Sequence, residues 1–268
     1  MQIPGWNRFG WLRHGFSTRS GGETIVYGDD GALNLGWTQD DDPAAVAENR
    51  QRLVQAVGGG SLVTIRQVHG AVTRAVREGD GAFEGRLQTA EGKAVLQGDG
   101  LMTNVAGVLL GIQTADCVPV LAVDVRQRVV AAFHAGWRGT AARMVEHGIA
   151  AMRTEYDSRP EDLIAAVGPS IGACCYAVGD EVKQAFEANF TYGGELLQRV
   201  GAETRLDLWE ANRRQLLDAG VAAEKIFVVA ECSGCALDDA GQRRYFSHRV
   251  DKGVTGRMMS VVGIVGGT

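Results

Sequence analysis

The chain has 268 residues, of which 45% are hydrophobic and 22% are charged, a balance that is typical of a globular protein and argues against disorder. The formal net charge of −5 argues against nucleic acid or an anionic membrane surface as the main partner. Five cysteines are an odd number for a disulfide framework, and residues 1–19 contain no apolar segment of signal-peptide length. We therefore expect a cytoplasmic protein.

The periodicity of apolar residues predicts both helices and strands along the chain. Asp42 and Pro43 are typical of a helix start, and Gly220 is typical of a helix end. The predicted helices are 42–57, 140–153, 180–188 and 207–219, and the predicted strands are 62–68, 108–112, 118–123, 129–133, 163–167, 226–230 and 258–265.

Several of these strands follow one another with no helix between them, which favours an α+β fold over strict βαβ alternation. The apolar stretch 105–125 is interrupted by polar residues and a proline, so it predicts two buried strands rather than a membrane span. Residues 78–100 are the best candidate for a long loop. No repeat or obvious linker divides the chain, and a domain boundary within residues 78–100 is possible but not required, so we expect one domain over residues 1–268. We also expect a monomer.

Three segments place a potential metal ligand beside an apolar strand and near glycine or proline: His69, Cys117 and His134. Two imidazoles and one thiolate suit a catalytic zinc ion, because three protein ligands leave the fourth position for water or substrate. Taken singly, each residue also has an ordinary structural explanation. A buried cysteine is often only a small hydrophobe, and a histidine at a strand end is often only a hydrogen-bonding residue.

Two further interpretations of these segments stay open. Cys117 is a candidate nucleophile for a reaction without metal, with His69 or His134 as its base. Asp116 precedes Cys117 and would face the opposite way on a strand, so it is a candidate for orienting a ligand histidine. A turn or a helix cap explains Asp116 equally well.

Two segments combine glycine with arginine, namely residues 17–22, which contain Arg19, and residues 136–140, which contain Trp137 and Arg138. Backbone amides at a helix N-terminus together with an arginine suit a phosphate group. Trp137 also offers a ring on which a base can stack. Tight turns and ordinary packing are the alternative explanations.

The other four cysteines lie in two pairs. Cys232 and Cys235 have the spacing of a zinc knuckle or a redox pair, but the sequence has no second such pair to complete a structural zinc site. Cys174 and Cys175 are adjacent, so we expect their side chains to diverge. We expect all four cysteines to be structural.

In combination, these segments resemble the YfiH-like laccase-domain family, which is also described as a multicopper polyphenol oxidase or purine nucleoside phosphorylase family. The most specific motifs are Thr-Ala-Asp-Cys-Val-Pro at 114–119 and His-Ala-Gly-Trp-Arg-Gly at 134–139. The other matching segments are 14–19, 33–36, 67–70, 168–172, 175–176, 246–249 and 255–257. The chain departs from the family pattern at two places: residues 98–100 are Gly-Asp-Gly where an Ala-Asp pair is usual, and residues 232–233 are Cys-Ser where Cys-Thr is usual. We expect neither segment to contact a proposed ligand.

The resemblance implies a layered α-β-β-α sandwich of the cysteine hydrolase type. It also implies phosphorolysis of adenosine, inosine and methylthioadenosine, and deamination of adenosine. The implied metal ligands are His69, Cys117 and His134, and with Asp116 they are the catalytic candidates. The candidates for substrate binding are Arg19, Asn34, Trp137 and Arg138.

Metal chemistry decides between the activities that the resemblance implies. Multicopper oxidation needs many histidines, and this chain has five in all. One thiolate with two imidazoles suits zinc, although it does not exclude a single copper. We therefore predict a zinc-dependent purine nucleoside phosphorylase with one zinc per chain, adenosine deaminase side activity, and nucleoside and phosphate as partners. The alternatives are a hydrolase that edits cell-wall precursors (UDP-MurNAc-peptides), a copper polyphenol oxidase and a non-catalytic metal-binding module.

Overall fold

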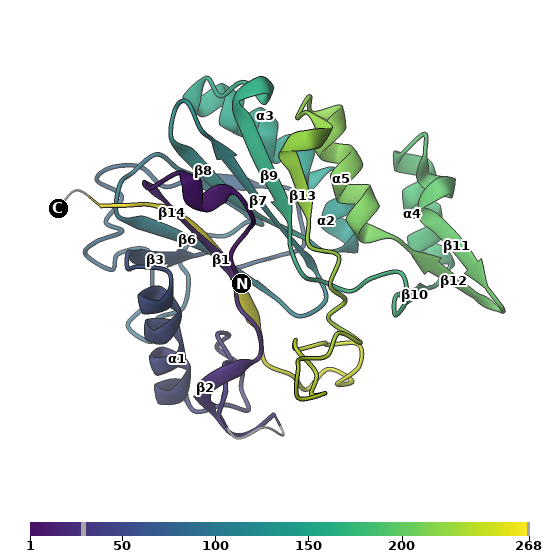
Figure 1. Cartoon of the computed structure of the whole chain (residues 1–268), viewed down its shortest axis with the longest axis horizontal. Helices are drawn as coiled ribbons and strands as arrows, with labels where there is room; N and C mark the ends of the chain where they lie inside the picture. Colours follow the sequence, from purple (N-terminus) through teal and green to yellow (C-terminus); the bar gives the residue numbers. More distant parts are fainter. Residues whose placement is uncertain (28–30, 267–268) are drawn as a thin grey trace.

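The computed structural model describes residues 1–27 and 31–266, and two stacked β-sheets form its centre (Figure 1). Within these residues the larger sheet has the strand order β13 (Ile226–Val228), β9 (Leu163–Val167), β7 (Val118–Asp124), β8 (Val129–Ala135), β5 (Gly100–Thr103) and β4 (Thr73–Ala75). The smaller sheet has the order β1 (Leu12–Phe16), β14 (Met258–Ile264), β6 (Val108–Thr114) and β3 (Ser61–Thr64). Most neighbouring strands are antiparallel, and the parallel pairs are β13 with β9, β4 with β5, and β3 with β6.

The helices lie outside the two sheets (Figure 1). They are α1 (Pro43–Ala56), α2 (Trp137–Ala141), α3 (Met144–Tyr156), α4 (Asp180–Asn189) and α5 (Leu208–Asp218). Short 3-10 helices are η1 (Trp6–Arg8), η2 (Pro160–Asp162), η3 (Gly193–Leu196) and η4 (Ala223–Lys225). The remaining strands are β2 (Ser20–Thr24) and the small sheet of β10 (Ala177–Val178), β12 (Glu203–Leu206) and β11 (Leu197–Val200), which lies beside α4 in Figure 1.

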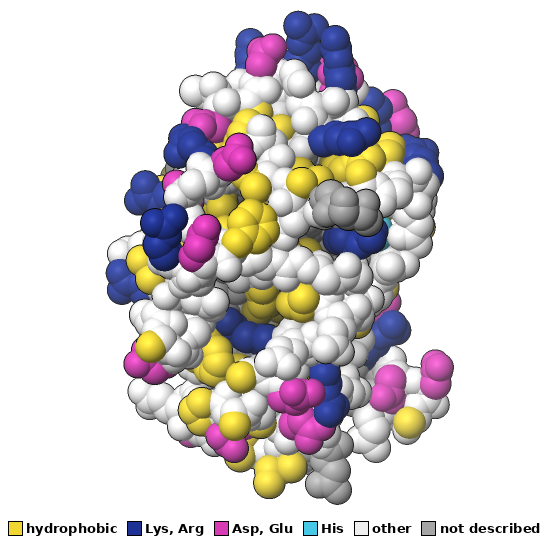
Figure 2. All heavy atoms as spheres, turned by 90° about the vertical axis from the view of Figure 1, so that its left-hand side faces the viewer, with side chains coloured by type: hydrophobic (Ala, Val, Ile, Leu, Met, Phe, Trp, Pro, Cys, Tyr) yellow, Lys and Arg dark blue, Asp and Glu magenta, His cyan; other side chains and the backbone are white. Residues whose placement is uncertain are grey.

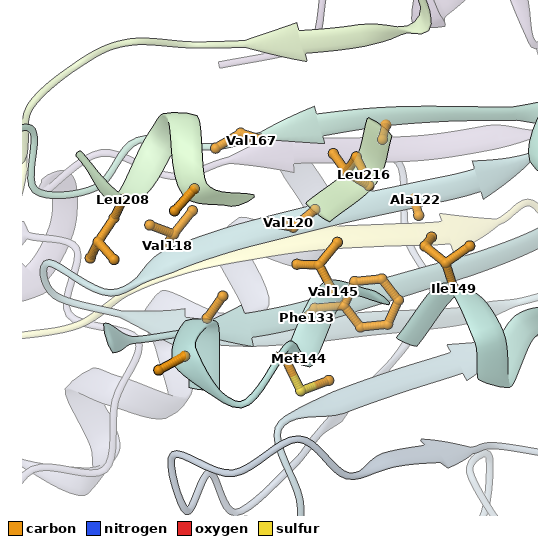
Figure 3. Packing of buried hydrophobic residues seen from close by; sticks show 14 of the residues in the cluster. Val118, Val120, Ala122, Phe133, Met144, Val145, Ile149, Val167, Leu208 and Leu216 are labelled. Carbon is orange, nitrogen blue, oxygen red and sulfur yellow. The ribbon is translucent and has the colours of Figure 1, made fainter. Parts of the chain in front are cut away.

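Alternation of side chains along the central strands explains the layers. On β7, Val118, Val120 and Ala122 belong to the core on the helix side of the sheet. Leu121 and Val123 point the other way, into the core between the two sheets. Figure 3 shows the first group packed against side chains of α3 and α5, namely Met144, Val145, Ile149, Leu208 and Leu216.

The opposite surface of the smaller sheet is covered by α1. Leu53 of this helix packs with Leu109, Met259 and Val261 in a separate cluster. Asp42 begins the helix, since its side chain accepts a hydrogen bond from the backbone of Ala44 at 2.9 Å. The layers are therefore helix, sheet, sheet and helix, and the predicted α+β class is confirmed. The relation to cysteine hydrolases stays a prediction.

Two predicted elements have different bounds in the structure. The helix predicted over 140–153 is divided into α2 and α3, because Arg143 adopts a left-handed conformation with φ 58° that no helix continues through. The strand predicted over 62–68 ends at Thr64. The predicted loop 78–100 lacks regular strands until β5 begins at Gly100.

Sequence reasoning missed several short strands. β4 has three residues and β10 has two, which is too short for any periodicity to show. β1 contains Arg13 and His14, yet it is paired along its whole length with β14. Its partner β14 lies more than 240 residues later in the chain, and the periodicity of nearby residues cannot predict such a distant contact.

The surface mixes charges of both signs. Lys and Arg side chains are interspersed with Asp and Glu on the face shown in Figure 2. Among the described residues, no helix has the length and apolar character needed to span a membrane.

Packing between α3 and the larger sheet gives a stability prediction. An added Cβ at Gly148 would lie 2.4 Å from Cε1 of Phe133, which is fully buried. We expect Gly148→Ala to lower the free energy of unfolding by about 1–3 kcal/mol, because overpacking outweighs the gain of roughly 1 kcal/mol in helix propensity. Thermal and denaturant unfolding measure this. Gly194→Ala is the control, since a Cβ there meets no atom within 4 Å. Equal free energies of unfolding for the two variants would contradict the close packing of Gly148 against Phe133.

Candidate active site

The structure brings the three predicted ligands together. The ligand atoms of His69, Cys117 and His134 all lie within 4.8 Å of one another. His134 lies in β8, and Cys117 immediately precedes β7, the strand that pairs with β8. His69 comes from the segment after β3, and its ring meets that of His134 edge to face with centroids 4.9 Å apart. One strand, the bend that leads into its neighbour and the segment after β3 therefore build the site.

A buried carboxylate, that of Asp99, holds two of these ligands. Its Oδ1 accepts a hydrogen bond from Nδ1 of His134 at 2.9 Å and from the backbone amide of His69 at 2.9 Å. The backbone amides of Gly70 and Val68 also donate to this carboxylate, at 2.7 Å and 3.2 Å. Because Nδ1 of His134 is engaged, its other ring nitrogen is left to act as a ligand.

The same contacts hold His69 in an unfavourable backbone conformation. Its φ is 59°, in the left-handed region that residues other than glycine rarely adopt. Such a conformation persists only where the surroundings enforce it. The three consecutive amides bound to Asp99 provide that enforcement.

Burial and charge set the ionisation of the site in the absence of a metal. Burial opposes ionisation of the Cys117 thiol, but the neighbouring His134 and His69 outweigh it and lower the pKa of Cys117 to about 6. Burial likewise opposes the charge on His134, but Cys117 and Asp99 outweigh it and raise the pKa of His134 to about 9. At neutral pH the pair is therefore a thiolate and an imidazolium. Burial disfavours the Asp99 carboxylate too, yet His134 and the amides keep its pKa below its usual value.

The donor set fits one zinc ion with an open position. A thiolate and two imidazoles are ligands that zinc prefers, and three of them are typical of a catalytic site. Gly136 leaves the room that the ligands need, because a Cβ there would come within 2.8 Å of Cys117 Sγ and 3.2 Å of His69 Cδ2. His134 is buried, while His69 is exposed at the open side.

That open side faces a cavity of about 760 Å³. Among the described residues that line it, Asp116 is the one carboxylate. Five basic side chains line it as well, namely Arg66, Lys93, Arg138, Arg249 and Arg257. Aromatic rings are contributed by Trp37, Trp137 and Tyr176. An acidic protein thus concentrates positive charge and flat apolar surface next to its candidate metal ligands, a combination suited to an anion and a planar ring.

Two of the four residues predicted to bind substrate line this cavity. They are Trp137 and Arg138, and the Arg138 guanidinium lies 4.2 Å from the centroid of the Trp137 ring. The Arg138 side chain is 58% exposed and 3.8 Å from Glu181. It is therefore accessible to a ligand in the cavity.

Arg19 and Asn34 are buried outside the set of residues that line the cavity. Arg19 donates to the carbonyl of Tyr27 at 2.9 Å, and its guanidinium lies 5.1 Å from the centroid of the Phe246 ring. Asn34 donates to Asp41 at 2.7 Å and accepts from the amide of Arg257 at 2.8 Å. These contacts join separate loops, so the structure places both residues outside the lining of this cavity, and their assignment to substrate binding stays a prediction.

The role predicted for Asp116 belongs to Asp99. The Asp116 carboxylate accepts hydrogen bonds from Ser233 Oγ at 2.6 Å, Ser247 Oγ at 2.7 Å and the amide of Arg249 at 2.7 Å. Asp99 contacts His134 instead. The expectation that the departure at 98–100 touches no ligand is therefore wrong.

Arg249 and Arg257 were missed as candidates for the cavity. Both lie in segments that carry the family resemblance, 246–249 and 255–257. Their position within these two segments was the feature of the sequence that could have identified them as candidates. Chemistry alone gave no reason to prefer these arginines over the others in the chain.

Comparison with known proteins places this geometry in a family. A family model described as multi-copper polyphenol oxidoreductase laccase matches residues 13–265. The chain belongs to this family. YlmD of Geobacillus stearothermophilus, named a purine nucleoside phosphorylase, is 38% identical over 268 residues, which cover 95% of this chain and 94% of YlmD. The crystal structure of that YlmD aligns with a TM-score of 0.83 and 36% identity over 99% of this chain and 98% of its own.

Two further relatives extend the comparison. The crystal structure of the Bacillus licheniformis hypothetical protein YfiH aligns with a TM-score of 0.84 and 32% identity, over 97% of this chain and 94% of its own. A protein from an unknown prokaryotic organism, named adenosine deaminase RL5, is 36% identical over 200 residues, which cover 73% of this chain and 74% of RL5. Members of this family thus carry names of two different nucleoside reactions.

The position of Asp99 predicts its effect on metal binding. We expect Asp99→Asn to weaken zinc binding roughly 10–100-fold, because the amide cannot serve all the donors that converge on the carboxylate. Competition with a chromogenic chelator measures the affinity. Asp124→Asn is the matched control, since Asp124 is equally buried but accepts from the turn amides of Arg126 and Gln127. Unchanged affinity in Asp99→Asn would show that Asp99 does not hold the ligands.

The thiolate of Cys117 gives a prediction for the metal-free protein. We expect alkylation of Cys117 to accelerate as the pH rises through about 6 and then to level off, because the ionised thiol is the nucleophile. Peptide mass spectrometry after timed iodoacetamide treatment measures this rate. His134→Ala removes the neighbouring positive charge, so the midpoint should move to higher pH. The exposed His147→Ala is the control. A midpoint unaffected by His134→Ala would contradict the ion pair.

Proposed function

We propose that this protein is a zinc-dependent purine nucleoside phosphorylase that acts on adenosine, inosine and methylthioadenosine. One observation carries the proposal. The Cys-His-His set opens into a cavity that is lined by basic and aromatic side chains. The name of the similar YlmD supports the reaction class.

The basic side chains would bind inorganic phosphate. Arg138 reaches the cavity from the N-terminal turn of α2, and Arg249 reaches it from the segment held by Asp116. Hydrogen bonds between arginine and phosphate are charge-assisted and often paired, which fixes the anion in position. The phosphate would then be placed to attack the sugar carbon as the N-glycosidic bond breaks.

The aromatic residues would hold the nucleoside. Trp137 and Tyr176 line the same cavity. Both rings already lie against arginines, since Arg138 lies over Trp137 and Arg249 lies 5.2 Å from the centroid of the Tyr176 ring. A purine stacked on either ring would lie next to the proposed phosphate site.

His69, Cys117 and His134 would hold the zinc, which when bound would supply a Lewis acid that polarises an oxygen of phosphate or water. Asp99 keeps His134 in the tautomer and orientation that a ligand needs. We propose that Asp116 acts as a positioning residue, because it lies next to Cys117 and fixes the backbone of Arg249. Copper is the alternative metal, and only one of its ions would fit this three-ligand set.

Water in place of phosphate would give a second reaction in the same cavity. Attack on the amino-bearing carbon of adenine would release ammonia and form inosine. The name of RL5 favours this side activity. We further propose that the protein acts as a monomer in the cytoplasm on small molecules rather than on nucleic acid, in keeping with five cysteines that are all free in the structure.

The two reactions should separate in an arginine variant. We expect Arg138→Ala to raise the KM for phosphate roughly tenfold or more, because a hydrogen bond to a charged group contributes about 1.5–3 kcal/mol. Deamination of adenosine should change little, since it uses no bound phosphate. Chromatography of products from adenosine, with and without phosphate, measures both rates. Arg153→Ala, an exposed arginine outside the cavity, is the control.

Two outcomes would contradict this assignment. An equal fall in both reactions would show that Arg138 serves folding or nucleoside binding. Absence of sugar 1-phosphate from every nucleoside tested with wild-type protein would instead favour hydrolysis of cell-wall precursors, or polyphenol oxidation if copper is bound.

A further inference from the structure

The four cysteines outside the active site converge. The sulfur atoms of Cys174, Cys175, Cys232 and Cys235 all lie within 4.8 Å of one another, and those of Cys174 and Cys235 are 3.6 Å apart. This corrects the expectation that Cys232 and Cys235 lack partners. It also corrects the expectation that the adjacent cysteines diverge.

Tight turns explain the convergence. Cys174 and Cys175 lie in a turn in which the amides of Cys175 and Tyr176 donate to the carbonyl of Gly172, so the backbone is not extended there. Cys232 and Cys235 lie in a second turn, closed by the amide of Cys235 on the carbonyl of Cys232 at 3.3 Å. In both turns, side chains that would point apart on a strand are gathered on one side.

The two turns are joined directly to each other. The amide of Ser233 donates to the carbonyl of Ser170 at 3.0 Å, and the amide of Gly172 donates to Cys232 Sγ at 3.3 Å. Gly234 permits close approach, because a Cβ there would lie 3.1 Å from Cys175 Cβ and 3.2 Å from its Sγ. The cluster is therefore held by backbone contacts.

The spacing fits a single tetrahedral ion. Zinc–sulfur bonds of about 2.3 Å place the thiolates of a tetrahedron roughly 3.8 Å apart, close to the separation between Cys174 and Cys235. A cluster of several irons would hold its four thiolates farther apart. Cys174 and Cys235 are exposed, which leaves a path for an ion to enter. We propose that these four cysteines bind a second, structural zinc ion, so that the chain carries two zinc ions rather than the one expected from its sequence.

This ion would stabilise the wall of the active-site cavity. Tyr176 follows Cys175 and lines the cavity. Ser233 follows Cys232 and donates to Asp116, which also lines the cavity. A metal that joins the two turns would fix both residues at once. The site does not depend on which reaction the cavity supports.

Metal counting in variants tests the proposal. Protein purified with reductant should contain two zinc ions per chain by inductively coupled plasma mass spectrometry. Cys174→Ser with Cys235→Ser should lose one of them, and His134→Ala should lose the other. In His134→Ala all four cysteines are native, and X-ray absorption of its remaining zinc should show four sulfur neighbours at about 2.3 Å.

Three results would overturn the proposal. The first is a double serine variant that keeps as much zinc as the wild type. The second is a His134→Ala protein that is folded but free of zinc, or whose zinc has nitrogen neighbours. The third is a Cys174–Cys235 disulfide in protein purified with reductant, detected as the loss of the two thiol hydrogens by intact mass. None of these readouts uses catalytic activity, so they are independent of the proposed phosphorolysis.

Discussion

The geometry of the candidate active site depends on the buried carboxylate of Asp99. This carboxylate orients His134 by accepting a hydrogen bond from Nδ1 of the ring, and it holds His69 in a left-handed conformation by accepting from three consecutive backbone amides. A side chain without two acceptor oxygens would leave at least one of these donors unpaired, which typically costs about 1–3 kcal/mol for each buried group. The Asp99 carboxylate thus links the segment after β3 to the end of β8. Cys117, just before β7, lies next to both histidines.

Around this contact the fold separates the paired strands next to the proposed metal ligands from the loops and helix ends that line the cavity. Pairing of β7 with β8 fixes the relative positions of Cys117 and His134, and the cores on both faces of that sheet keep the two strands in register. The basic and aromatic side chains come from loops and helix ends. Such an arrangement would hold the proposed metal ligands firmly, while the proposed substrate would be bound by segments at the surface.

Much of this could be predicted from the sequence, and the failures share a physical cause. Residue type and position beside apolar strands were enough to find the Cys-His-His set, and capping chemistry found the start of α1. Asp99 was missed because its importance arises from a hydrogen bond to a residue 35 positions away. Arg19 and Asn34 carry groups suited to a ligand, but in the structure these groups join loops outside the lining of the cavity. The second cysteine cluster depends on two turns whose conformations no periodicity reveals.

The most direct test of the account compares one reaction with and without metal. Protein loaded with zinc is incubated with adenosine and inorganic phosphate, and phosphorus NMR follows the formation of ribose 1-phosphate. The same protein stripped by a chelator, and then reconstituted with zinc, is measured in parallel. The account predicts that the sugar phosphate forms with zinc, disappears on stripping and returns on reconstitution. Full activity in the stripped protein would contradict it and would favour Cys117 as a nucleophile acting without metal.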